Sequence, residues 1–173
     1  MVSTISNMGK RSLNIKNLVP RKNGAYRQGY YALLNPAKYI GDPNKIIFRS
    51  SWEKKFAIYC DTNERIIAWS SEPFQIPYLN PVEREMKPYN VDFYMKVRSS
   101  NEKGYSEYIV EVKPSKQLKA PKAPSGRVTE KRMNDYTTQL KTYLVNLAKF
   151  QAAKDYAKDR GWSFVVVTET FIF

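Results

Sequence analysis

Histidine is absent from the 173 residues of this chain, and cysteine occurs once, at Cys60. Without histidine there can be no Ser-His-Asp or Cys-His nucleophile, no His-ligated zinc and no histidine general base. A single cysteine forms no intrachain disulfide and no cysteine zinc cluster, and it is compatible with a reducing compartment. Any hydrolytic chemistry must therefore use carboxylates, lysine, hydroxyl groups or a hard metal ion held by oxygen atoms.

Long apolar runs are missing as well. No stretch approaches the roughly 18 apolar residues of a membrane span, so no membrane partner is expected. The N-terminus lacks a continuous apolar segment and carries Lys10, Arg11 and Lys16, which predicts no secretion signal. The length suggests one domain with a real core, and the pattern favours a soluble intracellular protein.

Positive charge is abundant and unevenly placed, with a net charge of +13. Residues 1–40 hold seven Lys and Arg and no acid, whereas residues 41–113 hold eleven basic and eleven acidic residues. Residues 114–173 hold eleven basic and five acidic residues. Two cationic segments around a neutral middle indicate a polyanion binder, with nucleic acid as the first candidate and an acidic protein as the alternative.

The charge and composition divide the chain into a basic N-terminal arm, residues 1–40, and a folded domain, residues 41–173. The arm is rich in Asn, Ser, Lys and Arg, and its cations are mixed with Tyr26, Tyr30, Tyr31 and Tyr39. Such rings can stack on bases or pack on a protein surface. The pattern slightly favours a disordered or protein-docking arm.

Hydrophobic periodicity predicts an α/β domain. A first helix should begin after Ser50 and end near Cys60, and a second should span residues 134–160. Short strands are expected at 66–69, 74–78, 92–97, 108–113 and 162–168, with loops at 79–90 and 114–132. This order predicts a mixed central sheet flanked by helices.

Three residues carry the chemistry that this composition allows. Asp92 begins one predicted strand, and Glu111 and Lys113 lie two apart on the next, so their side chains share a face while Val110 and Val112 face the other way. Carboxylates on adjacent strands can bind a hard divalent cation, and a lysine beside them can hold a water or steady phosphate charge. The plain alternative is a solvated strand face.

The spacing of these residues matches a known signature. Asp92 followed by Glu111-Val112-Lys113 resembles the D…(D/E)-x-K pattern of the PD-(D/E)xK nuclease superfamily. With the blocks at 48–53, 74–78, 91–93, 110–114 and 161–164, the chain resembles the TnsA-type endonuclease N-terminal family. Segments 38–43 and 49–53 are similar to the head completion nucleases of large contractile-tailed bacteriophages. The resemblance covers residues 36–169, and Val91 stands where the superfamily often has proline.

The resemblance implies a restriction-endonuclease-like core and a role for each matching residue. Asp92, Glu111, the backbone carbonyl of Val112 and Glu53 would hold Mg²⁺, which Mn²⁺ can replace, and Lys113 would orient the attacking water. For Glu53 a second interpretation stays open, because Ser50 and Glu53 are spaced as a helix capping box.

The implied activity is a Mg²⁺-dependent deoxyribonuclease that hydrolyses packaged double-stranded DNA during phage head completion, before neck and tail join. The arm would dock on portal or neck proteins in the host cytoplasm, with retention in the virion left open. Alternatives are a structural head-closure protein with little turnover, a transposition endonuclease subunit, and a nucleic-acid-binding module without chemistry.

Further candidates lie after the predicted site. Phosphate contacts are expected from the cations of the long loop, with a flexible solvated loop as the alternative: Lys116, Lys119, Lys122, Arg127, Lys131 and Arg132. Gln139, Asn146 and Lys149 of the long helix could contact DNA, but the pattern favours a solvated helix face for them.

Overall fold

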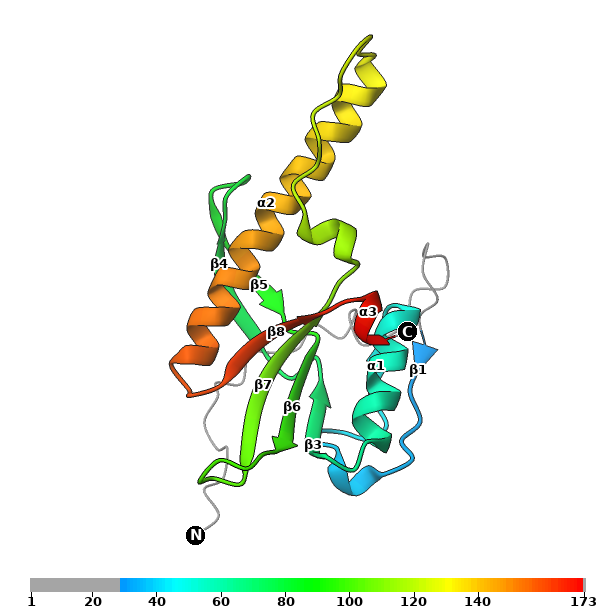
Figure 1. Cartoon of the computed structure of the whole chain (residues 1–173), viewed down its shortest axis with the longest axis vertical. Helices are drawn as coiled ribbons and strands as arrows, with labels where there is room; N and C mark the ends of the chain where they lie inside the picture. Colours follow the sequence, from blue (N-terminus) through cyan, green and yellow to red (C-terminus); the bar gives the residue numbers. More distant parts are fainter. Residues whose placement is uncertain (1–28, 173) are drawn as a thin grey trace.

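The computed structural model describes residues 29–172 of the chain. Its centre is a sheet in the strand order β3-β6-β7-β8, formed by Ile66–Ser71, Phe93–Arg98, Tyr105–Val112 and Ser163–Val167. β3, β6 and β7 are antiparallel neighbours, while β8 runs parallel to β7 and is reached through the long helix α2 (Glu130–Lys158). Figure 1 thus confirms the predicted α/β fold class, a mixed central sheet flanked by helices.

Helix α1 (Ser51–Thr62) covers one face of this sheet. Its apolar side chains, among them Phe56 and Cys60, pack with Trp69 of β3, Phe93 of β6 and Val110 of β7 in one buried cluster. Trp69 is completely buried. The short helix α3 (Glu169–Ile172) contacts α1, where Phe171 stacks edge-on against Tyr59.

Helix α2 (Glu130–Lys158) and a hairpin of β4 (Gln75–Asn80) and β5 (Glu85–Asn90) form a second cluster. Ala153 and Ala157 of the helix pack there with Tyr78, Tyr89 and Ile109. Because Ile109 belongs to this cluster and Val110 to the other, β7 shows the side-chain alternation expected of a strand covered on both faces.

The loop predicted for residues 79–90 is wrong in its second half, which forms β5. Asn80 makes the turn, since its side chain accepts a hydrogen bond from Val82 N at 2.9 Å and its carbonyl accepts one from Arg84 N at 2.8 Å. Pro77 and Pro88 stand opposite each other in the ladder. Their paired positions and the cover from α2 stabilise a hairpin whose polar, proline-containing sequence resembles a loop.

Residues 29–40, expected as part of the arm, pack on the domain. β1 (Gly29–Tyr30) pairs with β2 (Ile47–Phe48), and Tyr31 is buried in the cluster beneath α1. A 3-10 turn (Pro36–Lys38) follows, and Ile40 N donates to the carbonyl of Trp69 at 2.8 Å. The domain therefore includes residues on the N-terminal side of the expected boundary at 40, and the rest of the predicted arm lies outside the described residues.

The first half of α2 extends beyond the sheet. The helix spans Glu130–Lys158 rather than 134–160, and its buried residues all lie in its second half: Asn146, Ala153 and Ala157. Figure 1 shows residues 119–144, here called the projection, reaching away from the sheet beyond the 3-10 turn Ser115–Leu118. Thr129 caps the helix by accepting a hydrogen bond from Arg132 N at 3.3 Å. No helix of residues 29–172 is long and apolar enough to cross a membrane.

Candidate active site

The pairing of β6 with β7 brings Asp92 to Glu111. Phe93 faces Val110 across the ladder, so Asp92, one residue before β6, lies beside the end of β7. Its Oδ2 atom accepts a hydrogen bond from Val112 N at 2.8 Å, which anchors the carboxylate and leaves Oδ1 for another ligand. The structure thus brings together two carboxylates that lie 19 positions apart in the sequence.

Glu111 is almost completely buried, at 2% exposure, and its two oxygens have different partners. Lys113 Nζ lies 2.7 Å from Oε1, and the Tyr89 hydroxyl of β5 donates a hydrogen bond to Oε2. Glu111 and Lys113 share one face of the strand, whereas Val110 and Val112 belong to the cluster under α1. The solvated strand face considered from the sequence is therefore wrong for this pair.

The site concentrates negative charge in a buried place. Burial raises the pKa of Asp92 well above its ordinary value, and the neighbouring Glu111 raises it further, while Lys113 acts in the opposite direction. For Lys113, burial lowers the pKa, but the carboxylates of Glu111, Asp92 and Glu53 outweigh it and the pKa is raised. Lys113 is therefore held as an ammonium at neutral pH.

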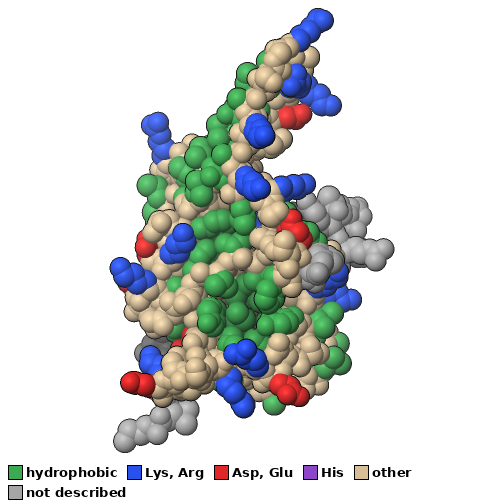
Figure 2. Space-filling view, in the orientation of Figure 1, with side chains coloured by type: hydrophobic (Ala, Val, Ile, Leu, Met, Phe, Trp, Pro, Cys, Tyr) green, Lys and Arg blue, Asp and Glu red, His purple; other side chains and the backbone are tan. Residues whose placement is uncertain are grey.

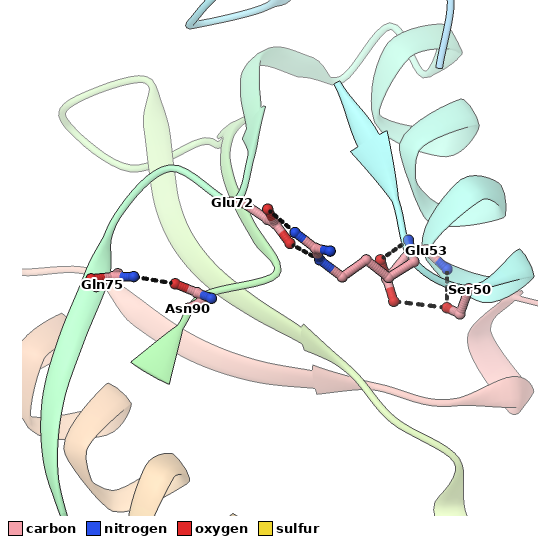
Figure 3. A network of polar contacts seen from close by, with 6 residues as sticks. Ser50, Glu53, Glu72, Gln75 and Asn90 are labelled. Atoms are coloured by element: carbon pink, nitrogen blue, oxygen red, sulfur yellow. Dashed lines mark hydrogen bonds and ion pairs between the residues drawn. The ribbon is translucent and has the colours of Figure 1, made fainter. Parts of the chain in front are cut away.

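Glu53 is a helix cap that also belongs to the electrostatic neighbourhood of the site. Ser50 Oγ accepts a hydrogen bond from Glu53 N at 3.1 Å and donates to its Oε1 at 2.9 Å, and Arg49 N donates to its Oε2 at 2.7 Å (Figure 3). Burial raises the pKa of Glu53, and these hydrogen bonds oppose the rise. Both carboxylate oxygens thus have local donors, while the charge still acts on Asp92 and Lys113.

An ion pair beside the site was not predicted from the sequence. Arg49 Nη2 lies 3.0 Å from Glu72 Oε2, and Glu72 N donates to the carbonyl of Asp92 at 2.9 Å. Figure 3 shows the Glu72 carboxylate paired with the Arg49 guanidinium, with the Gln75–Asn90 contact across the base of the hairpin nearby. Glu72 has φ 46°, a left-handed conformation that follows β3 and turns the chain toward β4. No local pattern signals this pair, because its residues come from separate turns.

The donor atoms suit a hard divalent cation. Among residues 29–172 no group of three or more Asp, Glu, Cys or His side chains is close enough to form a metal cluster, so side chains supply two carboxylates, Asp92 and Glu111. Such cations take backbone carbonyls and waters as further ligands. Burial raises the pKa of Asp92 and the charge of Glu111 raises it further, and a bound cation would stabilise the ionised carboxylate against both effects.

The six cations predicted to contact DNA are all exposed, and they line the stretch after β7. Lys116 belongs to the 3-10 turn, and the others lie on the projection. Figure 2 shows blue side chains along the projection to its tip. Arg132 Nη1 donates to the carbonyl of Arg127 at 2.9 Å, so this part of the loop is tied to the helix. The solvated helix face predicted further along holds for Gln139 but not for Asn146, which is buried, or Lys149, which is half-buried.

The site and fold define a nuclease-like domain, and comparisons with known proteins place the chain in a family. Residues 63–169 match the TnsA-like endonuclease N-terminal family, and the chain belongs to it. A relative, described as the head completion nuclease of Enterobacteria phage T4, is 37% identical over 141 residues, which is 82% of this chain and 90% of the relative. No solved structure shows significant similarity to the chain.

Proposed function

We propose that this protein is a metal-dependent DNA endonuclease, and the observation that carries the proposal is the group of Asp92, Glu111 and Lys113 at the end of β7. Asp92, Glu111 and the Val112 carbonyl would hold Mg²⁺, with Mn²⁺ able to replace it, and Glu53 would join through a water. Such an ion lowers the pKa of a bound water and screens the phosphate, so no histidine is needed. Lys113, an ammonium held against Glu111, would orient the attacking water.

The proposed biological role is phage head completion. Its support is the family membership together with the similarity to a protein described as a head completion nuclease. The enzyme would hydrolyse phosphodiester bonds of packaged DNA in the host cytoplasm before neck and tail attach. The basic segment before residue 29 would dock on portal or neck proteins, and some molecules would stay at the head-tail neck of the virion.

The projection would bind the DNA backbone. The +6 charge of residues 114–173 is carried in part by its exposed cations, which lie after the strand that holds Glu111 and Lys113. Phosphate contacts made by such side chains supply affinity that does not depend on sequence and that falls as salt rises.

The nuclease proposal is tested by cleavage of linear, branched and supercoiled DNA in Mg²⁺ and in Mn²⁺, with EDTA as a control. We expect metal-dependent cutting that Lys113→Ala lowers by about 10²–10³-fold, because a charge aimed at the reacting groups is lost. Lys103→Ala, an exposed lysine at the opposite end of the same two strands, should leave the rate unchanged.

Two outcomes would contradict the nuclease proposal. Folded protein that cuts none of the three substrates would favour the structural head-closure role. Cutting that persists in Lys113→Ala at the original rate would place the catalytic site elsewhere.

The role of the projection is tested by the salt dependence of DNA binding. A triple variant replaces three exposed cations of the projection with alanine: Arg127→Ala, Lys131→Ala and Arg132→Ala. The slope of log affinity against log salt should fall by about 0.9 for each phosphate contact removed, measured with Ca²⁺ in place of Mg²⁺. A control with the same change in charge, Lys45→Ala, Lys103→Ala and Lys158→Ala, should keep the slope. Equal slopes in both variants would remove the projection from the DNA interface.

A further inference from the structure

Lys149 of α2, for which the sequence pattern favoured a solvated helix face, faces the candidate active site. Its Nζ atom lies 5.6 Å from the ring centroid of Tyr78 on β4 and 5.6 Å from that of Tyr89 on β5. The hydroxyl of that same Tyr89 donates to Glu111. One tyrosine side chain therefore separates the Lys149 ammonium from the carboxylate at the centre of the site.

The ammonium of Lys149 is half-buried and makes no ion pair within the described part of the chain. Among the described residues, its contacts with specific partners are the two aromatic faces. Taking a cation out of water without a carboxylate partner is unfavourable, and aromatic faces offset only part of that cost. A cation in this position is suited to an anionic partner that arrives with the substrate.

The charges around Lys149 agree with this geometry. Burial lowers its pKa, and the positive Lys113 lowers it further, while Glu111 and Asp92 act in the opposite direction. The groups that act on Lys149 are thus those of the candidate active site. Lys158, further along α2, is exposed and serves below as the comparison.

A count of formal charges indicates which ligands would suit the site. With all three carboxyl groups ionised, as they would be around a bound cation, Asp92, Glu111 and Glu53 with Lys113 sum to −2, and one divalent cation would bring the site to zero. Lys149 adds one positive charge, which a single phosphodiester group of DNA would balance. Backbone phosphate is also the anion that a nuclease must bring to Asp92 and Glu111.

We propose that Lys149 binds a phosphate oxygen of the cleaved DNA strand, at or next to the bond that is broken. The proposal rests on the proposed nuclease function and adds to it a substrate contact from α2, on the side of the site opposite α1. Lys149 would neutralise phosphate charge while Lys113 orients the water, so the two lysines would have separate tasks. A purely structural role, packing on Tyr78 and Tyr89, is the competing explanation.

The test compares Lys149→Met, which keeps the apolar stem and removes the charge, with Lys149→Arg and with Lys158→Met as the matched control on the same helix. Binding of a DNA duplex is measured by fluorescence anisotropy in Ca²⁺ over a range of salt. Cleavage in Mg²⁺ gives kcat and KM, and thermal unfolding reports whether the variant remains folded.

We expect Lys149→Met to lower the slope of log affinity against log salt by about 0.9 and kcat by about 10²-fold, with no fall in the unfolding midpoint. Lys149→Arg should restore the slope, and Lys158→Met should change neither slope nor kcat.

The results separate failure of this inference from failure of the proposed function. If the unaltered protein cuts DNA and Lys149→Met has the same slope and kcat, the Lys149 proposal is overturned and the nuclease stands. If the unaltered protein cuts nothing, the proposed function is overturned, and the binding slope still decides whether Lys149 contacts phosphate. A fall in the unfolding midpoint of Lys149→Met with an unchanged slope would assign Lys149 to packing alone.

Discussion

Asp92→Asn is expected to abolish cleavage and at the same time to stabilise the metal-free protein. Burial raises the pKa of the Asp92 carboxyl, and the charge of Glu111 raises it further, so the ionised form is unfavourable there. The neutral amide removes this cost, while its oxygen can still accept the hydrogen bond from Val112 N. We expect cleavage to fall by about 10³-fold. In EDTA the gain should be about 1 kcal/mol, or a rise of roughly 2–4 °C in the unfolding midpoint.

The sign of the pH dependence follows from the raised pKa of Asp92. The native state holds a proton on this carboxyl at pH values where the unfolded chain has lost it, so stability falls as the pH rises from the ordinary value of 3.8 toward the raised pKa. The difference between Asp92→Asn and the unaltered protein should therefore be small at acid pH and largest near neutral pH.

Thermal unfolding in EDTA between pH 4 and pH 8, with parallel cleavage assays, checks both parts of this expectation. Glu102→Gln, an exposed acid of the turn between β6 and β7 at the end of these strands away from the site, is the control and should alter neither quantity. A variant that is less stable than the unaltered protein at neutral pH would show that the Asp92 carboxylate stabilises the fold. A variant that still cuts DNA would exclude Asp92 from the catalytic site.

Asp61→Ala should have the largest effect on stability. The Asp61 carboxylate is completely buried and accepts hydrogen bonds from the Tyr31 hydroxyl at 2.9 Å, Leu34 N at 2.7 Å and Asn35 N at 3.0 Å. Removing it leaves three donors without this acceptor, at about 1 kcal/mol or more each. We expect a loss of about 3 kcal/mol in the free energy of unfolding, measured in urea, because, of their described hydrogen bonds to α1, residues 31–35 would keep only the one from the Asn35 side chain to the carbonyl of residue 61.

A surface control and an intermediate variant sharpen this measurement. Asp42→Ala removes an exposed carboxylate from a nearby turn and should change stability by less than about 0.5 kcal/mol. Asp61→Asn should fall between the two, since the amide keeps one acceptor oxygen but turns a donor toward another N–H group. If Asp61→Ala matched the surface control, residues 31–35 would be held to the domain mainly by apolar packing.

The part of the site that lies on one strand could be predicted from the sequence. Glu111 and Lys113 share a face because side chains alternate along a strand, and the Ser50–Glu53 cap follows from spacing within one helical turn. The hairpin at 75–90 could not be predicted in the same way. Its second strand buries little besides Tyr89, so its formation depends on pairing with β4 and on cover from α2.

The same distinction applies to the whole chain. Composition was sufficient to exclude histidine chemistry, an intrachain disulfide and a cysteine zinc cluster, and short-range periodicity was sufficient to predict the mixed sheet. The candidate carboxylates and lysine were indicated by strand alternation together with the resemblance to a family signature. Packing brought Tyr89 to Glu111, Arg49 to Glu72 and Lys149 to the rings beside the site. These contacts join residues far apart in the chain, and no local pattern encodes them. The contacts of Tyr89 and Lys149 arise only when the hairpin and α2 close over one face of the sheet, and the Arg49–Glu72 pair arises only when the turn before α1 meets the turn after β3.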